Sequence, residues 1–479
     1  MIKREILPAS VLQSYPVPEE AKLDALLKEE LQKQQIRLVV LDDDPTGVQT
    51  VHHVSVYTNW TRESMEQAFS EEGRLFYILT NSRGMTQAET TKIHGEIMES
   101  VSWAAKKTGK PYLYISRSDS TLRGHYPLET QLLREGLEKE GCTVDGEVLF
   151  PFFLEGGRFT IGNVHYVKYG EELVPAAQTE FARDKTFGYS YSDLPSYIEE
   201  KTKGAYKASE VTCISLELLR SGNLQAVEEL LLSVKDFGKV CVNAVDYCDV
   251  KAFVIALYRA IGRGKHFMFR TAAGFVKVAG GISNQPLLTR GDMVTLKTHY
   301  GGVVVVGSHT AKTTAQLEEL RKLPYVEPVE FHSSLVLEGD EAFYQEVARC
   351  VAEEERIIKS GRTAVCFTER KLLTVENDTP ESALIRSVKI SDGVQRLVGD
   401  LHITPAFVIA KGGITSSDVG TKALKVTCAQ VMGQIRPGIP VWQTGEESKF
   451  PSTPYVIFPG NVGEATTLRE AVEILMKED

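Results

Sequence analysis

Several hallmarks of other protein classes are missing from this sequence. No apolar stretch approaches the roughly 20 residues that a membrane-spanning helix needs, and the opening stretch MIKREILPAS lacks the long apolar segment of a signal peptide. The seven cysteines are scattered, include no CxxC pair and in several cases lie inside apolar runs. These absences predict a reduced, cytoplasmic protein with neither a disulfide framework nor a zinc site.

An excess of positive charge is also missing. The formal net charge is -10 and the isoelectric point is near 5.7, which argues against nucleic acid or an acidic membrane as a main partner. Any anionic ligand must be held locally by arginine, lysine and backbone N–H groups. With 42% hydrophobic and 25% charged residues over 479 positions, the composition is that of a globular protein of two or three domains.

The chain does contain a regular alternation of short apolar runs and amphipathic stretches. A helix is expected over residues 18–35, because four leucines between 23 and 31 share one face. Unalternated apolar runs separated by helices are typical of parallel strands covered on both faces. The runs are 38–41, 75–79, 112–115, 147–150, 211–216, 239–243, 266–269, 303–306, 364–367, 407–410, 440–443 and 455–458.

The periodic pattern breaks between residues 274 and 300, where turn formers accumulate, so we place a domain boundary in this stretch. We predict an N-terminal helical extension (1–36), a first domain (37–290) and a second domain (291–479). Both domains are expected to be α/β, with mostly parallel sheets and ligand sites at the carboxyl ends of the strands.

Acids, arginines, hydroxyl groups and glycines follow four strands of the first half. A single acidic run is usually a solvated turn, and a nearby arginine often forms an ordinary salt bridge with it. Four such strand ends together instead indicate a pocket for a small anionic, polyhydroxylated ligand, since arginine pairs with carboxylates and aspartate accepts hydrogen bonds from hydroxyl groups. The four sets are Asp42-Asp43-Asp44 with Gly47; Arg83; Arg117 with Asp119, Ser120, Thr121, Leu122, Arg123 and Gly124; and Gly156, Gly157 and Arg158.

Strand ends in the second half are rich in glycine and poor in charge. Gly307-Ser308 follows one strand, the loop 412–417 follows another, and Gly460 follows a third. Such loops supply free N–H donors for phosphate, particularly where a helix begins. The stretch GSHTAKTT fails the P-loop pattern, and no G-x-G-x-x-G follows a strand. Three loops in one domain favour a nucleotide-phosphate site.

These stretches together resemble the four-carbon acid sugar kinases, the family of threonate and erythronate kinases. The resemblance covers nearly the whole chain after about residue 35. The family's D-D-x-T-G motif is matched by Asp43, Asp44, Thr46 and Gly47, and its D-S-T-x-R-G motif by Asp119, Ser120, Thr121, Arg123 and Gly124. Its nucleotide-side G-S, G-G-x-T and final glycine loops are matched by Gly307-Ser308, by Gly412, Gly413 and Thr415, and by 460–463.

The resemblance implies an ATP-dependent kinase of carbohydrate catabolism that phosphorylates a hydroxyl of a small sugar acid, with Mg²⁺ bridging the nucleotide phosphates. Asp43 or Asp44 would orient or deprotonate the hydroxyl, and Arg123 is the first choice for holding the carboxylate. The implied substrate-binding residues are Asp43, Asp44, Arg83, Asp119, Ser120, Thr121, Leu122, Arg123 and Gly124. The implied ATP-binding residues are Ser308, Gly412, Gly413, Ile414, Thr415 and Gly460.

Two departures from the family leave an alternative open. Ile414 stands where the family often has an aspartate, and Phe458-Pro459-Gly460 stands where it often has Lys-Ser-Gly. The nucleotide side thus lacks two charges, and a non-catalytic protein that binds or senses a sugar acid and a nucleotide is the competing hypothesis. An NAD-dependent dehydrogenase is less favoured, because the glycine fingerprint is missing.

Some features have no assigned role at this level. The N-terminal helix is expected to cover a sheet or to form a contact in a homo-oligomer. His52, His53, His125 and His309 lie near the predicted loops without zinc-ligand spacing, so hydrogen bonding is their expected role. The segment 178–194 has family-like character, but its residues indicate no function, and the metal ligands are unassigned.

Overall fold

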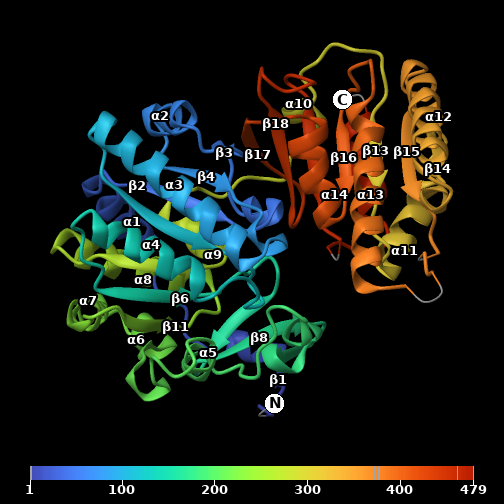
Figure 1. Cartoon of the computed structure of the whole chain (residues 1–479). Helices are drawn as coiled ribbons and strands as arrows, with labels where there is room; N and C mark the ends of the chain where they lie inside the picture. Colours follow the sequence, from blue (N-terminus) through green and yellow to red (C-terminus); the bar gives the residue numbers. More distant parts are fainter. Residues whose placement is uncertain (1–2, 372, 376–377, 461, 478–479) are drawn as a thin grey trace. The chain divides into compact units, whose positions relative to one another are not determined.

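A computed structural model describes residues 3–371, 373–375, 378–460 and 462–477 (Figure 1). The chain forms two compact units. Unit 1 comprises Met1–Val51 and Asn59–Asn284, and unit 2 comprises His52–Thr58 and Gln285–Asp479. The short segment His52–Thr58 therefore interrupts unit 1 in sequence and belongs to the second unit in space.

Unit 1 is built on a sheet of seven parallel strands. The central strands are buried on both faces, as the unalternated apolar runs predict, and each predicted strand of the first half is present. In spatial order they are β10 (Thr212–Ile214), β11 (Gly238–Val242), β6 (Gly146–Phe150), β12 (Phe267–Thr271), β5 (Tyr112–Arg117), β2 (Arg37–Asp42) and β4 (Leu75–Leu79).

Helices cover both faces of this sheet (Figure 1). One layer contains α2 (Arg62–Ser70), α3 (Gln87–Thr108) and α4 (Leu128–Lys139), and the other contains α7 (Leu224–Ser233), α8 (Tyr247–Gly262) and α9 (Ala273–Ala279). The predicted N-terminal helix is α1 (Glu20–Lys33), which packs on α8 through ion pairs such as Arg259–Glu30 (2.9 Å) and Lys251–Asp24 (2.6 Å). Its role is thus to extend the second helical layer.

A small antiparallel sheet combines three strands inserted between β6 and β10 with one strand near the N-terminus, and the sequence pattern did not predict it. Its order is β1 (Leu7–Pro8), β9 (Glu172–Pro175), β8 (Val164–Tyr169) and β7 (Arg158–Ile161). The insertion continues through the segment 176–193 into α5 (Leu194–Lys201) and ends at β10. The short helix α6 (Leu216–Arg220) follows β10. A cluster of buried side chains, including Leu122, Tyr126, Tyr189 and Tyr197, joins it to the loop after β5.

Unit 2 has an eight-strand sheet that is parallel on one side only. The parallel part is β19 (Pro454–Phe458), β16 (Val408–Lys411), β13 (Val303–Val306), β15 (Thr363–Thr368) and β14 (Val326–Phe331). It is continued by antiparallel pairing through β18 (Ile439–Thr444), β17 (Cys428–Arg436) and β3 (Val54–Tyr57). The run 440–443 is therefore a strand as predicted, but it is antiparallel to its neighbours.

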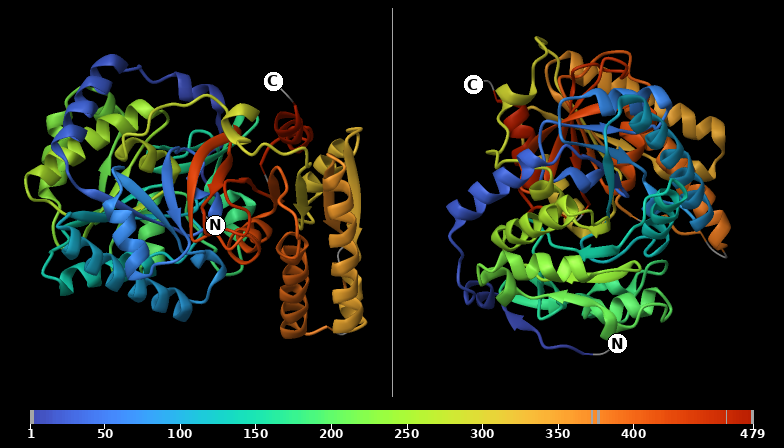
Figure 2. Two further views of the ribbon diagram at one scale, coloured as in Figure 1. Left: turned by 90° about the horizontal axis from the view of Figure 1, so that it is seen from above. Right: turned by 90° about the vertical axis from the view of Figure 1, so that its left-hand side faces the viewer.

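The helices of unit 2 also form two layers. The long helices α12 (Asp340–Lys359) and α13 (Pro380–Gly399) pack side by side, with α14 (Gly413–Asp418) next to α13 (Figure 2). On the other face lie α10 (Arg290–Met293), α11 (Ala311–Leu320) and α15 (Thr467–Met476). Met293 of α10 and leucines of α11 and α15 enter the core of this unit. No helix among the described residues combines the length and apolar character that a bilayer span requires.

Each sheet contains a topological switch point, where strands that follow one strand in sequence lie on both sides of it. In unit 1 the strands that follow β2 lie on either side of it, β4 on one side and β5 on the other. In unit 2 the same holds for β13, which lies between β15 and β16. Ligands of open α/β sheets bind at the carboxyl ends of the strands at such points. The observed architecture confirms the predicted α/β class with mostly parallel sheets.

Candidate functional site

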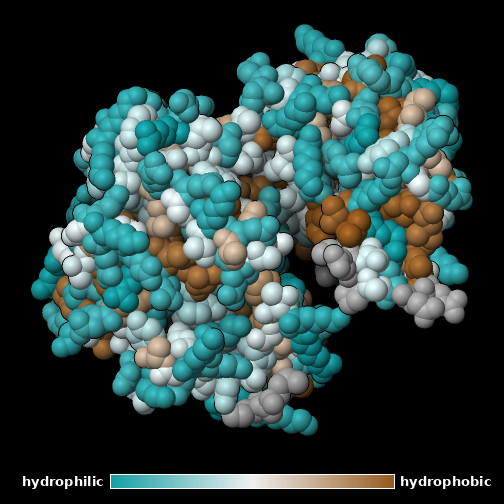
Figure 3. Space-filling model, in the orientation of Figure 1, coloured by the Kyte–Doolittle hydropathy of each residue, from teal (hydrophilic) through white to brown (hydrophobic). Residues whose placement is uncertain are grey.

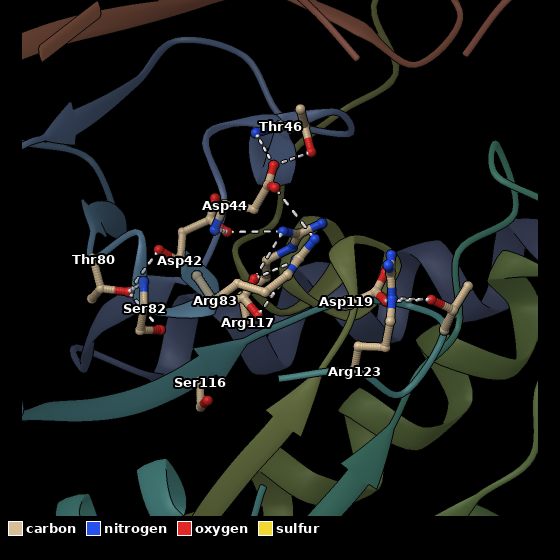
Figure 4. Close-up of polar contacts among 12 residues, drawn as sticks. Asp42, Asp44, Thr46, Thr80, Ser82, Arg83, Ser116, Arg117, Asp119 and Arg123 are labelled. Atoms are coloured by element: carbon tan, nitrogen blue, oxygen red, sulfur yellow. Dashed lines mark hydrogen bonds and ion pairs between the residues drawn. The ribbon is translucent and has the colours of Figure 1, made fainter. Parts of the chain in front are cut away.

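The acidic run at the end of β2 lies at the topological switch point of the unit 1 sheet (Figure 4). Asp42 is buried and pairs with Arg117 of β5 at 2.8 Å. Burial raises the pKa of Asp42 to about 7, although Arg117 acts against this rise. Gly47 packs directly on the Asp42 carboxylate, so that any side chain at position 47 would overlap it. Asp42 and Arg117 thus stabilise the end of β2 internally.

Asp43 and Asp44 share one arginine but differ in exposure. Arg83 holds Asp43 through two hydrogen bonds, of 2.6 and 3.2 Å, and lies 3.3 Å from Asp44. Burial raises the pKa of Asp43, against the Arg83 charge. Burial also acts to raise the pKa of Asp44, but Arg83 and two hydrogen bonds from Thr46 outweigh it and lower the pKa. Asp44, with 19% of its side chain exposed, is the ionised carboxylate that a ligand can reach.

The loop after β5 has a backbone that is held from several sides. Its carbonyl groups at Ser120, Thr121 and Leu122 accept hydrogen bonds from His165 (2.8 Å), Tyr189 (2.8 Å) and Tyr197 (2.9 Å) respectively. All three donors come from the inserted region between β6 and β10. The loop is therefore rigid, with Leu122 in the left-handed region at φ 69°.

Within this loop Asp119 binds Arg123 at 2.6 Å and also accepts a hydrogen bond from Thr121. Gly124 adopts φ +113°, and a Cβ atom there would lie 2.6 Å from Arg270 and 3.0 Å from Asp43. Only glycine therefore lets the loop approach the acidic run. The structure brings together Asp43, Asp44, Arg83, Asp119, Thr121, Arg123 and Gly124 around one strand-end region, whereas Ser120 and Leu122 serve mainly through their backbone.

Arg270 of β12 and Glu129 of α4 belong to this cluster, and the sequence reasoning missed both. β12 lies between β5 and β6, so Arg270 reaches Ser116 at 2.9 Å and forms a buried ion pair with Glu129. Glu129 also accepts a hydrogen bond from Ser82 at 2.5 Å. The only sequence signal was a charged residue within the apolar stretch HFMFRT, and its location required the strand order.

The segment 178–194, which had no predicted role, lies beside the loop that follows β5. Phe181 lies under the guanidinium groups of both Arg123 (5.1 Å) and Arg158 (5.6 Å), and Asp184 lies 3.8 Å from Arg123. Phe187 contacts the ring of His125, which bonds to the Met85 carbonyl group at 2.9 Å. This segment therefore forms one wall of the strand-end cluster.

In unit 2 the three predicted glycine loops converge. A Cβ atom at Gly307 would collide with Thr415, one at Gly412 (φ +124°) would lie 3.2 Å from Ser308, and one at Gly460 would lie 3.6 Å from the Ser308 hydroxyl group. The loops after β13, β16 and β19 are thus in mutual contact. Ser308, Gly412, Gly413, Thr415 and Gly460 come together as predicted, while the side chain of Ile414 is 75% exposed.

Two cations lie at these loops, and neither was among the predicted site residues. Lys411, fully buried at the end of β16, donates to the carbonyl groups of Pro459 (2.6 Å) and Gly460 (3.0 Å). Burial, with a contribution from Lys312, lowers the pKa of Lys411 to about 7. Arg370, after β15, donates to the Ser308 carbonyl group (2.7 Å) and to Thr314 (2.9 Å). Its Nε and Nη1 groups have no partner among the described residues.

A pocket of about 730 Å³ adjoins the glycine loops within unit 2. Gly307, Thr415 and Ile414 form the part of its wall nearest the loops, and apolar residues of α13 continue it. Val388 of that helix is 60% exposed, and Figure 3 shows apolar surface on this unit just below the place where Figure 1 labels α13 and α14. A pocket with both apolar and polar side chains in its wall, beside backbone donors, suits a ligand with a flat base and a phosphate chain.

Comparisons with known proteins agree with this division. Residues 38–279 match the family described as sugar-binding N-terminal domain, and residues 303–468 match the nucleotide-binding C-terminal domain. No curated protein matches the sequence.

Two solved structures share the fold. The "putative tRNA synthase" of Salmonella typhimurium LT2 has 16% identity and a TM-score of 0.65, covering 91% of this chain and 99% of that one. Haemophilus influenzae protein HI1011 has 16% identity and a TM-score of 0.60, covering 91% and 100%. At this identity the likeness concerns the fold alone. The two matched domains, in this order and over these strand-end loops, show that the chain belongs to the four-carbon acid sugar kinase family.

Proposed function

We propose that this protein is an ATP-dependent kinase that phosphorylates a hydroxyl group of a small sugar acid, threonate- or erythronate-like or related, in carbohydrate catabolism. The observation that carries the proposal is the contrast between the two strand-end clusters. One is built from ionised aspartate and arginine side chains, which suits a hydroxy acid, and the other from glycine, serine and threonine with two cations, which suits a phosphate chain.

Asp44 is the residue that we assign to the attacking hydroxyl group. Its carboxylate is ionised, accessible and oriented by Arg83 and Thr46. The hydroxyl oxygen would form a bond to the γ-phosphorus as the bond from phosphorus to the ADP oxygen breaks, and the hydroxyl proton would pass to Asp44. Because the transition state of phosphoryl transfer is loose, orienting the nucleophile contributes more than strong basicity.

ATP would occupy the unit 2 cluster. The loops at Ser308, Gly412–Thr415 and Gly460 would hold the phosphates through backbone N–H and hydroxyl groups, and the adjoining pocket would hold the nucleoside. Arg370 supplies positive charge there, and Lys411 supplies it when protonated, although the aspartate and lysine that the family often has at positions 414 and 458 are missing. The positive charge of the missing lysine is thus in part replaced from neighbouring strands.

Mg²⁺ fits this site as part of the nucleotide substrate. Ser308, Thr310 and Thr313 supply hydroxyl groups near the loops, but the described residues contain no cluster of three acidic, histidine or cysteine ligands. Mg²⁺ keeps several waters and needs only one or two protein ligands. When bound to the triphosphate it would offset the charge on the β- and γ-phosphates.

The competing function is a protein that binds both ligands without transfer. The exposed Ile414 in place of an aspartate favours it. The two are separated by incubating the full chain with MgATP and a panel of four- to six-carbon sugar acids, and measuring ADP release and the phosphorus NMR signal of a phosphate ester. An ester formed by the wild type but not by Asp44→Asn supports the kinase. Binding of ATP with no ester from any acid supports the non-catalytic alternative.

A further inference from the structure

Arginine side chains in the unit 1 cluster differ in whether their charge is already neutralised. Four of them form ion pairs with acidic side chains at 3.8 Å or less. The pairs are Arg83 with Asp43 and Asp44, Arg117 with Asp42 and Asp43, Arg123 with Asp119 and Asp184, and Arg270 with Glu129. A guanidinium group that is already paired has less to gain from a ligand carboxylate.

Arg158 is the exception among the described residues of this cluster. No acidic side chain forms an ion pair with it, and its Nε group is buried without a hydrogen-bond partner. Its Nη1 group donates a hydrogen bond to the Gly156 carbonyl group. Burial lowers the pKa of Arg158, with the more distant Asp119 acting against this, but an arginine stays protonated at any physiological pH. Arg158 is therefore the one arginine described in this cluster without an acidic partner, although Arg117, which is paired with Asp42, also has a buried Nε group without a hydrogen bond.

The position of Arg158 is well defined. Its backbone pairs with Phe153 through hydrogen bonds of 2.9 and 3.1 Å, which close the turn after β6. Its guanidinium group lies over the ring of Phe181, which also contacts Arg123 from 5.1 Å. Phe181 thus holds the unpaired arginine beside the loop that ends at Gly124. A buried guanidinium donor without a partner is unfavourable by itself, and in Arg158 it coincides with the lack of an acidic partner, which a ligand carboxylate would supply.

We propose that Arg158 binds the carboxylate of the sugar acid, and that Phe181 positions it. This inference rests on the proposed kinase function and replaces Arg123, the first choice from sequence, in that role. The planar fork of arginine matches a carboxylate through two parallel hydrogen bonds. Arg123, already bound to Asp119, would instead shape the loop around the substrate hydroxyl groups.

The test compares steady-state kinetics of Arg158→Gln, Arg158→Lys and Phe181→Leu with the wild type on the sugar acid that the panel identifies. Arg158→Gln should raise KM for the acid about 10- to 100-fold, the effect of losing a charged hydrogen-bonded pair, with kcat and the KM for ATP within about twofold. Arg158→Lys should recover part of the loss and Phe181→Leu should lose less than Arg158→Gln. Arg183→Gln, an exposed residue in the same segment, is the matched control and should change nothing.

An unchanged KM for the acid in Arg158→Gln would overturn the assignment. A loss confined to kcat would also overturn it, because it would place Arg158 against the transferring phosphoryl group. If no sugar acid is phosphorylated by the wild type, the proposed function fails separately. Calorimetric titration of threonate and erythronate into wild type and Arg158→Gln then decides the inference, since equal affinity, or no binding to either, rejects it.

Discussion

A methionine in place of Lys411 should change how the stability of unit 2 depends on pH. Lys411 is fully buried, and its amine donates to the Pro459 and Gly460 carbonyl groups without an acidic partner among the described residues. Burial lowers its pKa from the ordinary value of 10.5 to about 7. Because the unfolded chain then binds the proton more tightly than the folded protein does, stability rises as pH increases between these two values.

The size of the effect follows from the two pKa values. One pKa unit is worth about 1.4 kcal/mol, so the separation between 10.5 and about 7 corresponds to a free energy on the order of 5 kcal/mol. Below about pH 7 the protonated lysine destabilises the fold by this full amount, and above 10.5 the effect is gone. From about pH 7.5 to about 9.5 the wild type should gain roughly 2 to 3 kcal/mol relative to Lys411→Met.

The assay is urea unfolding at several pH values, followed by the fluorescence of Trp442, which is buried in unit 2 on β18. The other two tryptophans, Trp60 and Trp103, belong to unit 1 and are replaced by phenylalanine in both proteins. The difference between wild type and Lys411→Met cancels the titration of all other groups. Parallel stability curves for the two proteins over this pH range would refute the reasoning, because they would mean that Lys411 titrates alike in both states.

Three other substitutions test separate parts of the site. Asp44→Asn should lower kcat at least about 100-fold with little change in stability, since it removes the carboxylate that orients the hydroxyl; equal turnover in the two proteins contradicts this role. Gly124→Ala should abolish acid turnover and destabilise unit 1 by about 1 to 3 kcal/mol, because a Cβ atom at φ +113° would press on Arg270 and Asp43; an active, equally stable variant counts against the rigid loop. Arg370→Gln should weaken ATP binding about tenfold in a direct titration and leave acid binding intact; unchanged ATP affinity removes Arg370 from the phosphate site.

Local sequence patterns predicted much of the fold. The apolar runs predicted every parallel strand of unit 1 and most strands of unit 2 because a strand buried on both faces needs an unbroken apolar stretch. The same reading missed β7, β8 and β9, which pair antiparallel and lack an unbroken apolar stretch. It also missed β3, because a short strand that pairs with β17, distant in sequence, has no local signature of its partner.

The candidate site, like the fold, could be predicted only in part from the sequence. Residues directly after strands could be collected from the sequence, since the carboxyl ends of parallel strands lie on one edge of a sheet. The sequence could not show which of these charged side chains are already paired and which remain free to bind a ligand. Arg83, Arg117 and Arg123 looked alike in sequence, yet each is bound to a nearby aspartate, while Arg158 is not paired with any acidic side chain among the described residues.

The sequence by itself determined the α/β class, the positions of most strands and the two kinds of strand-end loop, because apolar periodicity and turn chemistry act over a few neighbouring residues. Only the tertiary structure decided that β12 brings Arg270 between the loops, that Lys411 and Arg370 lie at the glycine turns, and that Arg158 keeps an unused donor. These facts depend on strand order and on ion pairing between distant segments, and both are settled only when the chain packs.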